Sequence, residues 1–133
     1  MTGGSGAKEK PLLNRARYDY HSGMNTLQNE YCQVTVSATS EEEANALSDS
    51  LVRRKLVAGS LILHGRSRYW WEGKIVEMIY YNVQTFSLFA NKEEIISEVK
   101  KLHRDKCPIV AFVPLDGNME FLQWIRDNVN VKR

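Results

Sequence analysis

The clearest hydrophobic pattern along the chain is a strict alternation between residues 31 and 38. Successive side chains of a strand point to opposite faces, so this pattern predicts a half-buried strand. Its apolar positions are Cys32, Val34, Val36 and Ala38. A helix is predicted next, because Ser40 is followed three residues later by Glu43, the spacing of a capping box. Apolar residues then recur at helical spacing until Lys55, where we expect the helix to end.

The remaining pattern predicts three more strand segments and two more helices. Residues 57–63 form a short apolar strand that Gly65 is expected to interrupt. Residues 68–89 indicate either one long bent strand or a hairpin around Gly73. A second helix is predicted from a cap at Asn91 to a point before Pro108, followed by a strand over 109–113. Residues 121–129 have the spacing of a terminal helix.

This order of elements is typical of an α+β protein with the split β-α-β arrangement of ferredoxin-like folds. The expected architecture is a β-α-β-β-α-β sandwich with an extra C-terminal helix. Helices cover one face of such a sheet and leave the other face open. The segment from 69 to 89 carries more bulky apolar side chains than two helices can hide. We therefore expect identical copies to cover one another.

The first 30 residues show no apolar periodicity and are rich in Gly, Ser, Asn, Lys and Arg. Such a segment buries little surface, so a disordered N-terminal tail is predicted over residues 1–30. The alternative is that a few of its aromatic residues pack onto the domain. The folded domain is expected over residues 31–133.

The composition excludes several classes of protein. With 133 residues, 43% of them hydrophobic and 26% charged, the chain has the makeup of one globular domain. No apolar run approaches the roughly 20 residues that cross a bilayer, and no secretory signal is seen. The net charge of +2 is spread along the chain, which does not favour nucleic-acid binding. The two cysteines are too few for a disulfide scaffold, so reduced thiols and a cytoplasmic location are predicted.

Three strings of residues resemble the CutA divalent-cation-tolerance family. They are Lys-Leu-Val-Ala at 55–58, Tyr-Trp-Trp-Glu-Gly-Lys-Ile at 69–75 and Phe-Leu-Gln-Trp-Ile at 121–125. The most specific is the second, since adjacent tryptophans beside a Gly-Lys turn are rare. The resemblance, from about residue 31 to 125, implies a tight PII-like homotrimer with a ferredoxin-like protomer. It also implies a cytosolic protein associated with copper and other divalent cations, without established catalytic activity.

The chain departs from the family pattern in the expected pocket. Gly59 stands where family members often carry a cysteine. The family motif His-Pro-Tyr-Glu-Val-Pro-Glu retains only His103 and Pro108, and its second carboxylate is replaced by Ile109. Gln84 and Thr85 replace the usual Lys-Thr pair, which removes one positive charge. The resemblance therefore implies a retained scaffold with an altered pocket.

His103 and Cys107 are the candidate ligands for a divalent metal ion. One helical turn separates them, and imidazole with thiolate suits copper or zinc. Asp105 is a candidate oxygen donor, and a trimer axis is a way to gather copies of His64 or His103. The alternative is a helix-end histidine with a small buried cysteine, because tetrahedral zinc normally takes four ligands.

A ligand-binding cleft between subunits is the second candidate site, formed by Lys74, Gln84 and His103. The comparison with PII proteins implies an anion at Lys74, whose alternative role is that of a solvated turn residue. Tyr69, Trp70 and Trp71 are predicted at the trimer interface, and strand alternation places the two tryptophans on opposite faces, one of them toward the helices.

No nucleophile motif or phosphate loop is present, so no enzyme is predicted. The two functional hypotheses are a trimer that binds a divalent cation or small ligand, and a structural or partner-binding trimer without the family metal site.

Overall fold

The structure is a computed structural model of the chain, and it describes residues 18–19, 24–25, 30–105 and 107–131. The elements in chain order are the strands β2 (Tyr18–Asp19), β3 (Met24–Asn25) and β4 (Tyr31–Ala38), helix α2 (Glu41–Arg53), strands β5 (Gly59–Trp71) and β6 (Lys74–Leu88), the short 3₁₀ helix η1 (Phe89–Asn91), helix α3 (Lys92–Leu102), strand β7 (Val110–Pro114) and helix α4 (Met119–Asn128).

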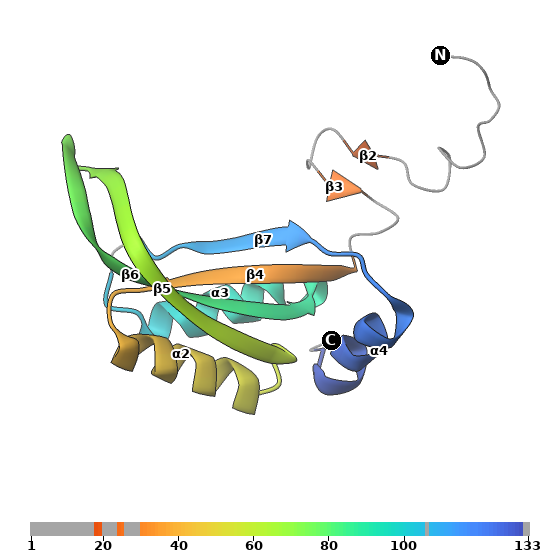
Figure 1. Ribbon diagram of the computed structural model, residues 1–133. Helices are drawn as coiled ribbons and strands as arrows, with labels where there is room; N and C mark the ends of the chain where they lie inside the picture. The colour runs from red at the N-terminus through yellow and green to blue at the C-terminus, as the bar shows by residue number, and fades with distance from the viewer. Residues whose placement is uncertain (1–17, 20–23, 26–29, 106, 132–133) are drawn as a thin grey trace, which may run out of the picture.

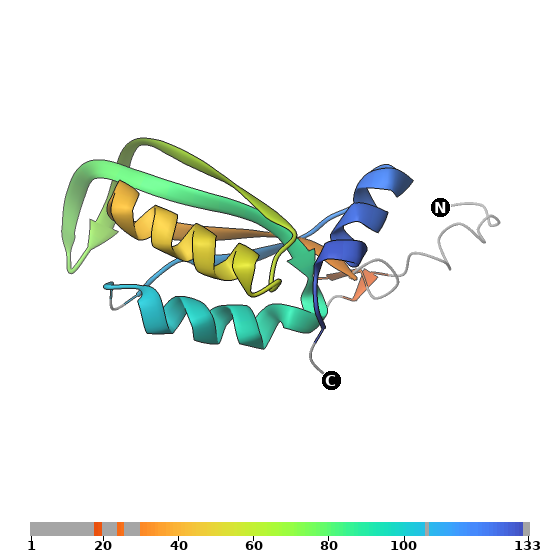
Figure 2. The same ribbon diagram turned by 90° about the horizontal axis from the view of Figure 1, so that it is seen from below.

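The main sheet has four strands in the order β5-β6-β4-β7, and every neighbouring pair is antiparallel. Helices α2 and α3 lie side by side on one face of this sheet (Figures 1 and 2). The predicted ferredoxin-like α+β fold and the extra C-terminal helix are therefore confirmed. Helix α4 packs at the end of the sheet, where Ile125 and Val129 contact Leu88.

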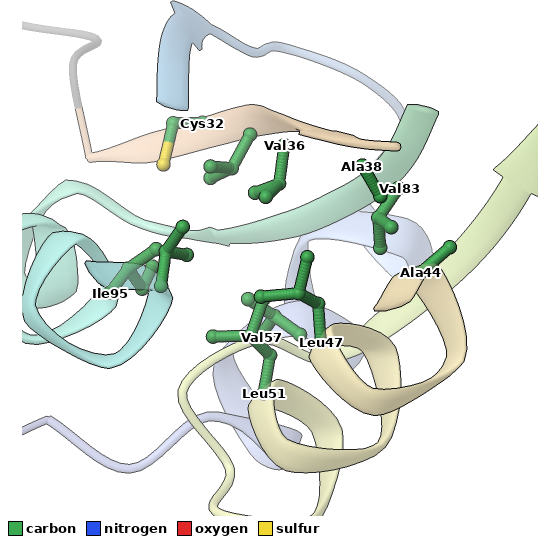
Figure 3. Packing of buried hydrophobic residues seen from close by; sticks show 11 residues of the cluster. Cys32, Val36, Ala38, Ala44, Leu47, Leu51, Val57, Val83 and Ile95 are labelled. Carbon is green, nitrogen blue, oxygen red and sulfur yellow. The ribbon is translucent and has the colours of Figure 1, made fainter. Parts of the chain in front are cut away.

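The core forms between the sheet and its two helices. The four apolar residues predicted for β4 are all fully buried. They pack with Leu47 and Leu51 of α2 and with Ile95 and Val99 of α3. Figure 3 shows Val36 and Ala38 directed toward the helix that carries Leu47. The alternation read from the sequence thus identifies the buried face of the central strand.

Strands β5 and β6 form a long hairpin, which decides between the two predictions for residues 68–89. Their pairing runs from Gly59 opposite Phe86 to Trp71 opposite Lys74. The two turn residues, Glu72 and Gly73, have φ values of 50° and 79°, the left-handed region that tight hairpin turns require. Strand β4 ends opposite Tyr81, and the hairpin tip projects beyond it and away from the helices (Figure 1).

The predicted interruption at Gly65 is wrong. Gly65 lies within β5, opposite Tyr80 of β6. The residues before and after it are also paired with β6, so the strand continues through this position. The predicted side-chain cap at Asn91 is also wrong. Asn91 is fully buried, and its amide donates hydrogen bonds to the carbonyl oxygens of Leu56 and Asn130 at 3.2 and 2.8 Å. It ties two loops together instead of capping α3.

The first helix begins as predicted and ends slightly earlier than Lys55. The hydroxyl of Ser40 accepts a hydrogen bond from the Glu43 N–H at 3.1 Å, which confirms half of the capping box. The Glu43 carboxylate turns to the N–H of Thr39 rather than to that of Ser40. Helix α2 ends at Arg53, and Lys55 has a φ of 57° that leaves the helical region.

Most of the predicted N-terminal tail lies outside the described residues. Within residues 1–30, the structure describes Glu30 and an antiparallel pairing of β2 with β3. Its predicted disorder and the boundary at residue 30 stay predictions. Cys32 is buried and Cys107 exposed, and neither forms a disulfide. Among the described residues, no helix has the length and apolar character needed to cross a membrane.

Candidate functional site

The sheet face opposite the helices exposes large aliphatic side chains. Leu61, Leu63 and Val113 are 54%, 45% and 51% exposed. They belong to the two edge strands, at positions that alternate with the core residues Ile62 and Phe112. The open apolar face predicted from the sequence is therefore present in the protomer.

A cavity of 620 Å³ lies on this same face, between the hairpin and the loop that joins α3 to β7. The hairpin side is largely aromatic and apolar. Its residues include Tyr69, Trp71, Met78 and Tyr80. The loop side adds charged and polar groups, namely Arg104, Asp105 and Cys107. The size and the mixture of apolar walls with a few polar groups are those of a small-molecule pocket.

One hydrogen bond joins the two sides of the cavity. The Tyr80 hydroxyl donates to the Asp105 carboxylate at 2.6 Å. Burial raises the pKa of Tyr80, and the adjacent Asp105 carboxylate raises it further because it would repel a phenolate. Tyr80 therefore stays a neutral donor. Its contact with Asp105 holds the loop against the hairpin.

The buried carboxylate of Glu43 in α2 anchors the loop between α3 and β7. This carboxylate accepts hydrogen bonds from the N–H of Arg104 at 2.8 Å and from the N–H and hydroxyl of Thr39 at 2.8 and 3.0 Å. Burial alone would raise the pKa of Glu43. The hydrogen bonds from Thr39 and Arg104 outweigh it and hold the pKa below its ordinary value. Glu43 is thus an ionised anchor for the cavity loop.

The structure does not place His103 as a free metal ligand. Its side chain is only 1% exposed. Its Nδ1 accepts a hydrogen bond from the Asp105 N–H at 3.0 Å, so the proton lies on Nε2, which is 2.6 Å from the carbonyl oxygen of Ser37. Both ring nitrogens are engaged by the protein. As placed here, His103 has no nitrogen lone pair free for a metal ion, and its role as a ligand stays a prediction.

The other predicted site residues are not gathered with His103. Cys107 is exposed at the cavity. Lys74 begins β6 at the hairpin turn, and Gln84 lies roughly 30 Å of extended chain away on the same strand. One protomer therefore does not assemble the predicted cleft of Lys74, Gln84 and His103. No group of three or more His, Cys, Asp or Glu side chains suited to a metal ion occurs within the described part of the chain.

The two adjacent tryptophans lie on opposite faces of the hairpin, as predicted, but neither is covered by helices. Trp70 is 72% exposed and Trp71 is 43% exposed. Trp71 and Tyr69 line the cavity, while Trp70 lies on the other face beside Ile75. The expectation that one tryptophan packs on the helices is wrong, because the hairpin extends beyond them.

Sequence reasoning missed Tyr80 and Glu43, and it named Asp105 only as a metal donor. The aromatic residues of the hairpin are evident in the sequence. Their contact with the loop between α3 and β7 depends on the tertiary structure, which brings distant segments together. Tyr80 and Asp105 are 25 positions apart, and Glu43 and Arg104 are 61 apart. No local pattern signals such contacts.

Comparison with known proteins identifies this scaffold. A family model described as CutA1 divalent ion tolerance protein matches residues 32–128. The chain belongs to this family. The match agrees with the resemblance seen from about residue 31 to 125. CutA membership also supports a role in divalent cation tolerance.

Individual CutA proteins align over almost their whole length. The chain is similar to the divalent-cation tolerance protein CutA of Archaeoglobus fulgidus, with 32% identity over 97 residues that cover 72% of this chain and 95% of the relative. The CutA of Thermus thermophilus is 33% identical over 101 residues, covering 71% and 94%.

Solved structures agree with this fold. A structure of the A. fulgidus protein, described as periplasmic, has a TM-score of 0.72 and 31% identity over 75% of this chain and 99% of that chain. The CutA1 of Oryza sativa has a TM-score of 0.73 and 25% identity over 77% and 96%.

Proposed function

We propose that this CutA protein acts as a non-enzymatic homotrimer with a role in divalent cation tolerance in the cytoplasm. The observation that supports the trimer is the open apolar face, where Leu61, Leu63 and Val113 remain exposed in the protomer. Burying one large aliphatic side chain is worth about 1.5–3 kcal/mol, so leaving this face in water is costly. Closed symmetric assembly covers the same face on every copy.

Among the described residues of one protomer, the donor atoms around His103 do not fit a bound copper or zinc ion. Both nitrogens of His103 are engaged within the fold, and the Asp105 carboxylate accepts from Tyr80. The proposed role therefore needs no resident metal within a protomer. A copper or zinc site in the proposed trimer would take donors from several copies, for example the exposed His64 side chains.

Mass photometry of the purified full chain tests the assembly. A trimer is expected for the natural sequence, and Leu63→Arg is expected to give monomers because it places a charge on the covered face. Met119→Arg is the matched control, since Met119 is exposed at the start of α4 and outside the sheet. A monomeric natural protein, or a trimer that withstands Leu63→Arg, contradicts the proposal.

Calorimetric titration of the trimer with Cu²⁺ and Zn²⁺ tests the role in cation tolerance. Heat of binding that disappears in His64→Ala supports donors shared between copies. A trimer that binds neither ion favours the second candidate, a structural or partner-binding trimer without the family metal site. The engaged ring of His103 is the observation that favours this second candidate.

A further inference from the structure

The open face of the main sheet, turned away from α2 and α3 (Figure 1), is polar at its centre. The two inner strands, β4 and β6, present Gln33, Thr35 and Gln84 to this face. These positions alternate with the core residues Val34 and Val83, whose side chains point toward the helices. Thr35 lies directly opposite Gln84, and all three side chains are half-buried in the protomer. These three residues form the polar centre of the face.

Aliphatic residues of the two edge strands border the polar centre. Leu61 of β5 lies opposite Gln84, and Val113 of β7 lies opposite Gln33. Both aliphatic side chains are about half exposed, at 54% and 51%. Their exposure favours a cover over the whole face, and such a cover also removes water from the polar groups between them. Whatever covers the face therefore has to supply partners for the polar centre.

The protomer itself offers these groups no partner. Among the described residues, the side chains of the polar centre form no hydrogen bond with the backbone or with another side chain. In the next row of β6, the Oδ1 atom of Asn82 is shielded from solvent and also lacks a partner in the described part of the chain. Water satisfies the half-buried groups only while the face stays open, because a buried polar group without a partner is costly.

The polar centre is uncharged and complementary to itself. A glutamine amide both donates and accepts hydrogen bonds, and a threonine hydroxyl does the same. The same groups on a second copy of this chain are therefore suitable partners. Because none of them is charged, identical copies bring no like charges together at this place.

We propose that the polar centre joins copies of this chain, with Gln33, Thr35 and Gln84 forming hydrogen bonds to the same residues of neighbouring copies. The inference rests on the proposed trimer and names the contacts that fix how its copies fit together. Polar residues in an otherwise apolar interface can set the register and the number of copies, because misaligned copies leave them unpaired. The polar centre therefore selects copies of this chain over a partner with a purely aliphatic face.

A triple variant tests the proposal by replacing the polar centre with apolar side chains of similar size: Gln33→Leu, Thr35→Val and Gln84→Leu. Isotope-labelled natural chains and variant chains are mixed in urea and refolded slowly, and native mass spectrometry measures each composition of trimer. The variant alone is expected to assemble, since replacing both partners of a hydrogen bond by apolar groups costs little. Mixed trimers leave natural side chains unpaired, so they are expected roughly five-fold or more below the binomial proportion.

Gln123→Leu is the matched control. Gln123 is exposed on α4, where its amide donates to the Asp127 carboxylate at 2.8 Å. The same change of residue type at this place is expected to give mixed trimers in the binomial proportion. That result also shows that copies exchange fully during the slow refolding.

Hydrogen exchange of side-chain amides in the natural protein is a second test, which needs no variant. NMR follows the NH₂ groups of Gln33, Gln84 and Gln123 in deuterated water. The two amides of the polar centre are expected to exchange roughly ten-fold or more slowly than that of Gln123, because a paired and covered amide has to open before it exchanges.

Two results overturn the inference. One is a mixture in which the triple variant is depleted from mixed trimers no more than Gln123→Leu. The other is an exchange of the Gln33 and Gln84 amides as fast as that of Gln123, which indicates a water-filled centre. Mass photometry of the same samples separates these outcomes from the proposed function. A monomeric natural protein contradicts the trimer and this contact together, whereas a trimer that gives either result contradicts the polar contact alone.

Discussion

Replacing Glu43 by glutamine tests whether its buried carboxylate anchors the cavity loop. In the structure this group accepts three hydrogen bonds, two from Thr39 and one from the Arg104 N–H. A glutamine side chain has one oxygen and one NH₂ group in their place. Whichever way the amide turns, at least one backbone N–H then faces another donor.

The expected cost follows from these contacts. Hydrogen bonds to a charged acceptor contribute about 1.5–3 kcal/mol, and an unpaired buried donor costs a similar amount, so Glu43→Gln is expected to lower the free energy of unfolding by about 2–4 kcal/mol. Glu42→Gln is the control in the same helical turn. Glu42 is exposed, and its loss is expected to cost less than about 1 kcal/mol through the helix dipole.

The same carboxylate predicts a pH dependence. Its pKa is lowered in the folded protein, so its stabilisation is complete above the unfolded pKa and is lost as the pH falls through the folded pKa. The difference between the natural protein and Glu43→Gln is therefore expected to shrink below about pH 4.

Urea denaturation followed by circular dichroism measures both effects, at one protein concentration because assembly adds to stability. A Glu43→Gln variant as stable as Glu42→Gln refutes the anchoring role. So does a difference that stays constant down to pH 3.

Three further substitutions test the hairpin and its surroundings. Trp70→Ala and Trp71→Ala are each expected to dissociate the proposed trimer in mass photometry, because both rings are exposed in the protomer. Gly73→Ala is expected to cost roughly 1 kcal/mol in urea denaturation, since its φ is +79°. Gly59→Ala is expected to cost roughly 1–3 kcal/mol in thermal denaturation, because the new methyl would lie 2.9 Å from Cη2 of Trp124.

Gly65→Ala is the control for both glycine substitutions. Its added methyl meets no described atom within 4 Å and needs no left-handed backbone, so stability is expected to be kept or slightly raised. A Gly73→Ala protein that is as stable as Gly65→Ala contradicts the idea that the turn needs a glycine at position 73. A fully stable Gly59→Ala would show that the Trp124 ring moves aside freely. Trimers that persist in both tryptophan variants contradict their place at the interface.

The sequence predicted the elements whose signals are local. Alternation in 31–38 identified the buried face of β4, and Ser40 marked the start of α2. Local signals misled at Gly65 and Asn91. Gly65 is held in a continuous ladder by β6, and the Asn91 amide is drawn to the carbonyl oxygens of two other loops. In both cases tertiary contacts outweighed the local preference.

The candidate site shows the same division more sharply. Sequence alone determined the ferredoxin-like order and the unusual number of aromatic residues in the hairpin, because these follow from composition and short-range spacing. The family followed from the resemblance of three short strings to CutA proteins. Only the tertiary structure decided that both ring nitrogens of His103 form hydrogen bonds within the protein and that the Tyr80 hydroxyl bonds to Asp105 across a cavity. Whether a side chain keeps a lone pair free depends on residues that are distant in the sequence and adjacent in the fold. Residue type and local spacing do not specify those contacts.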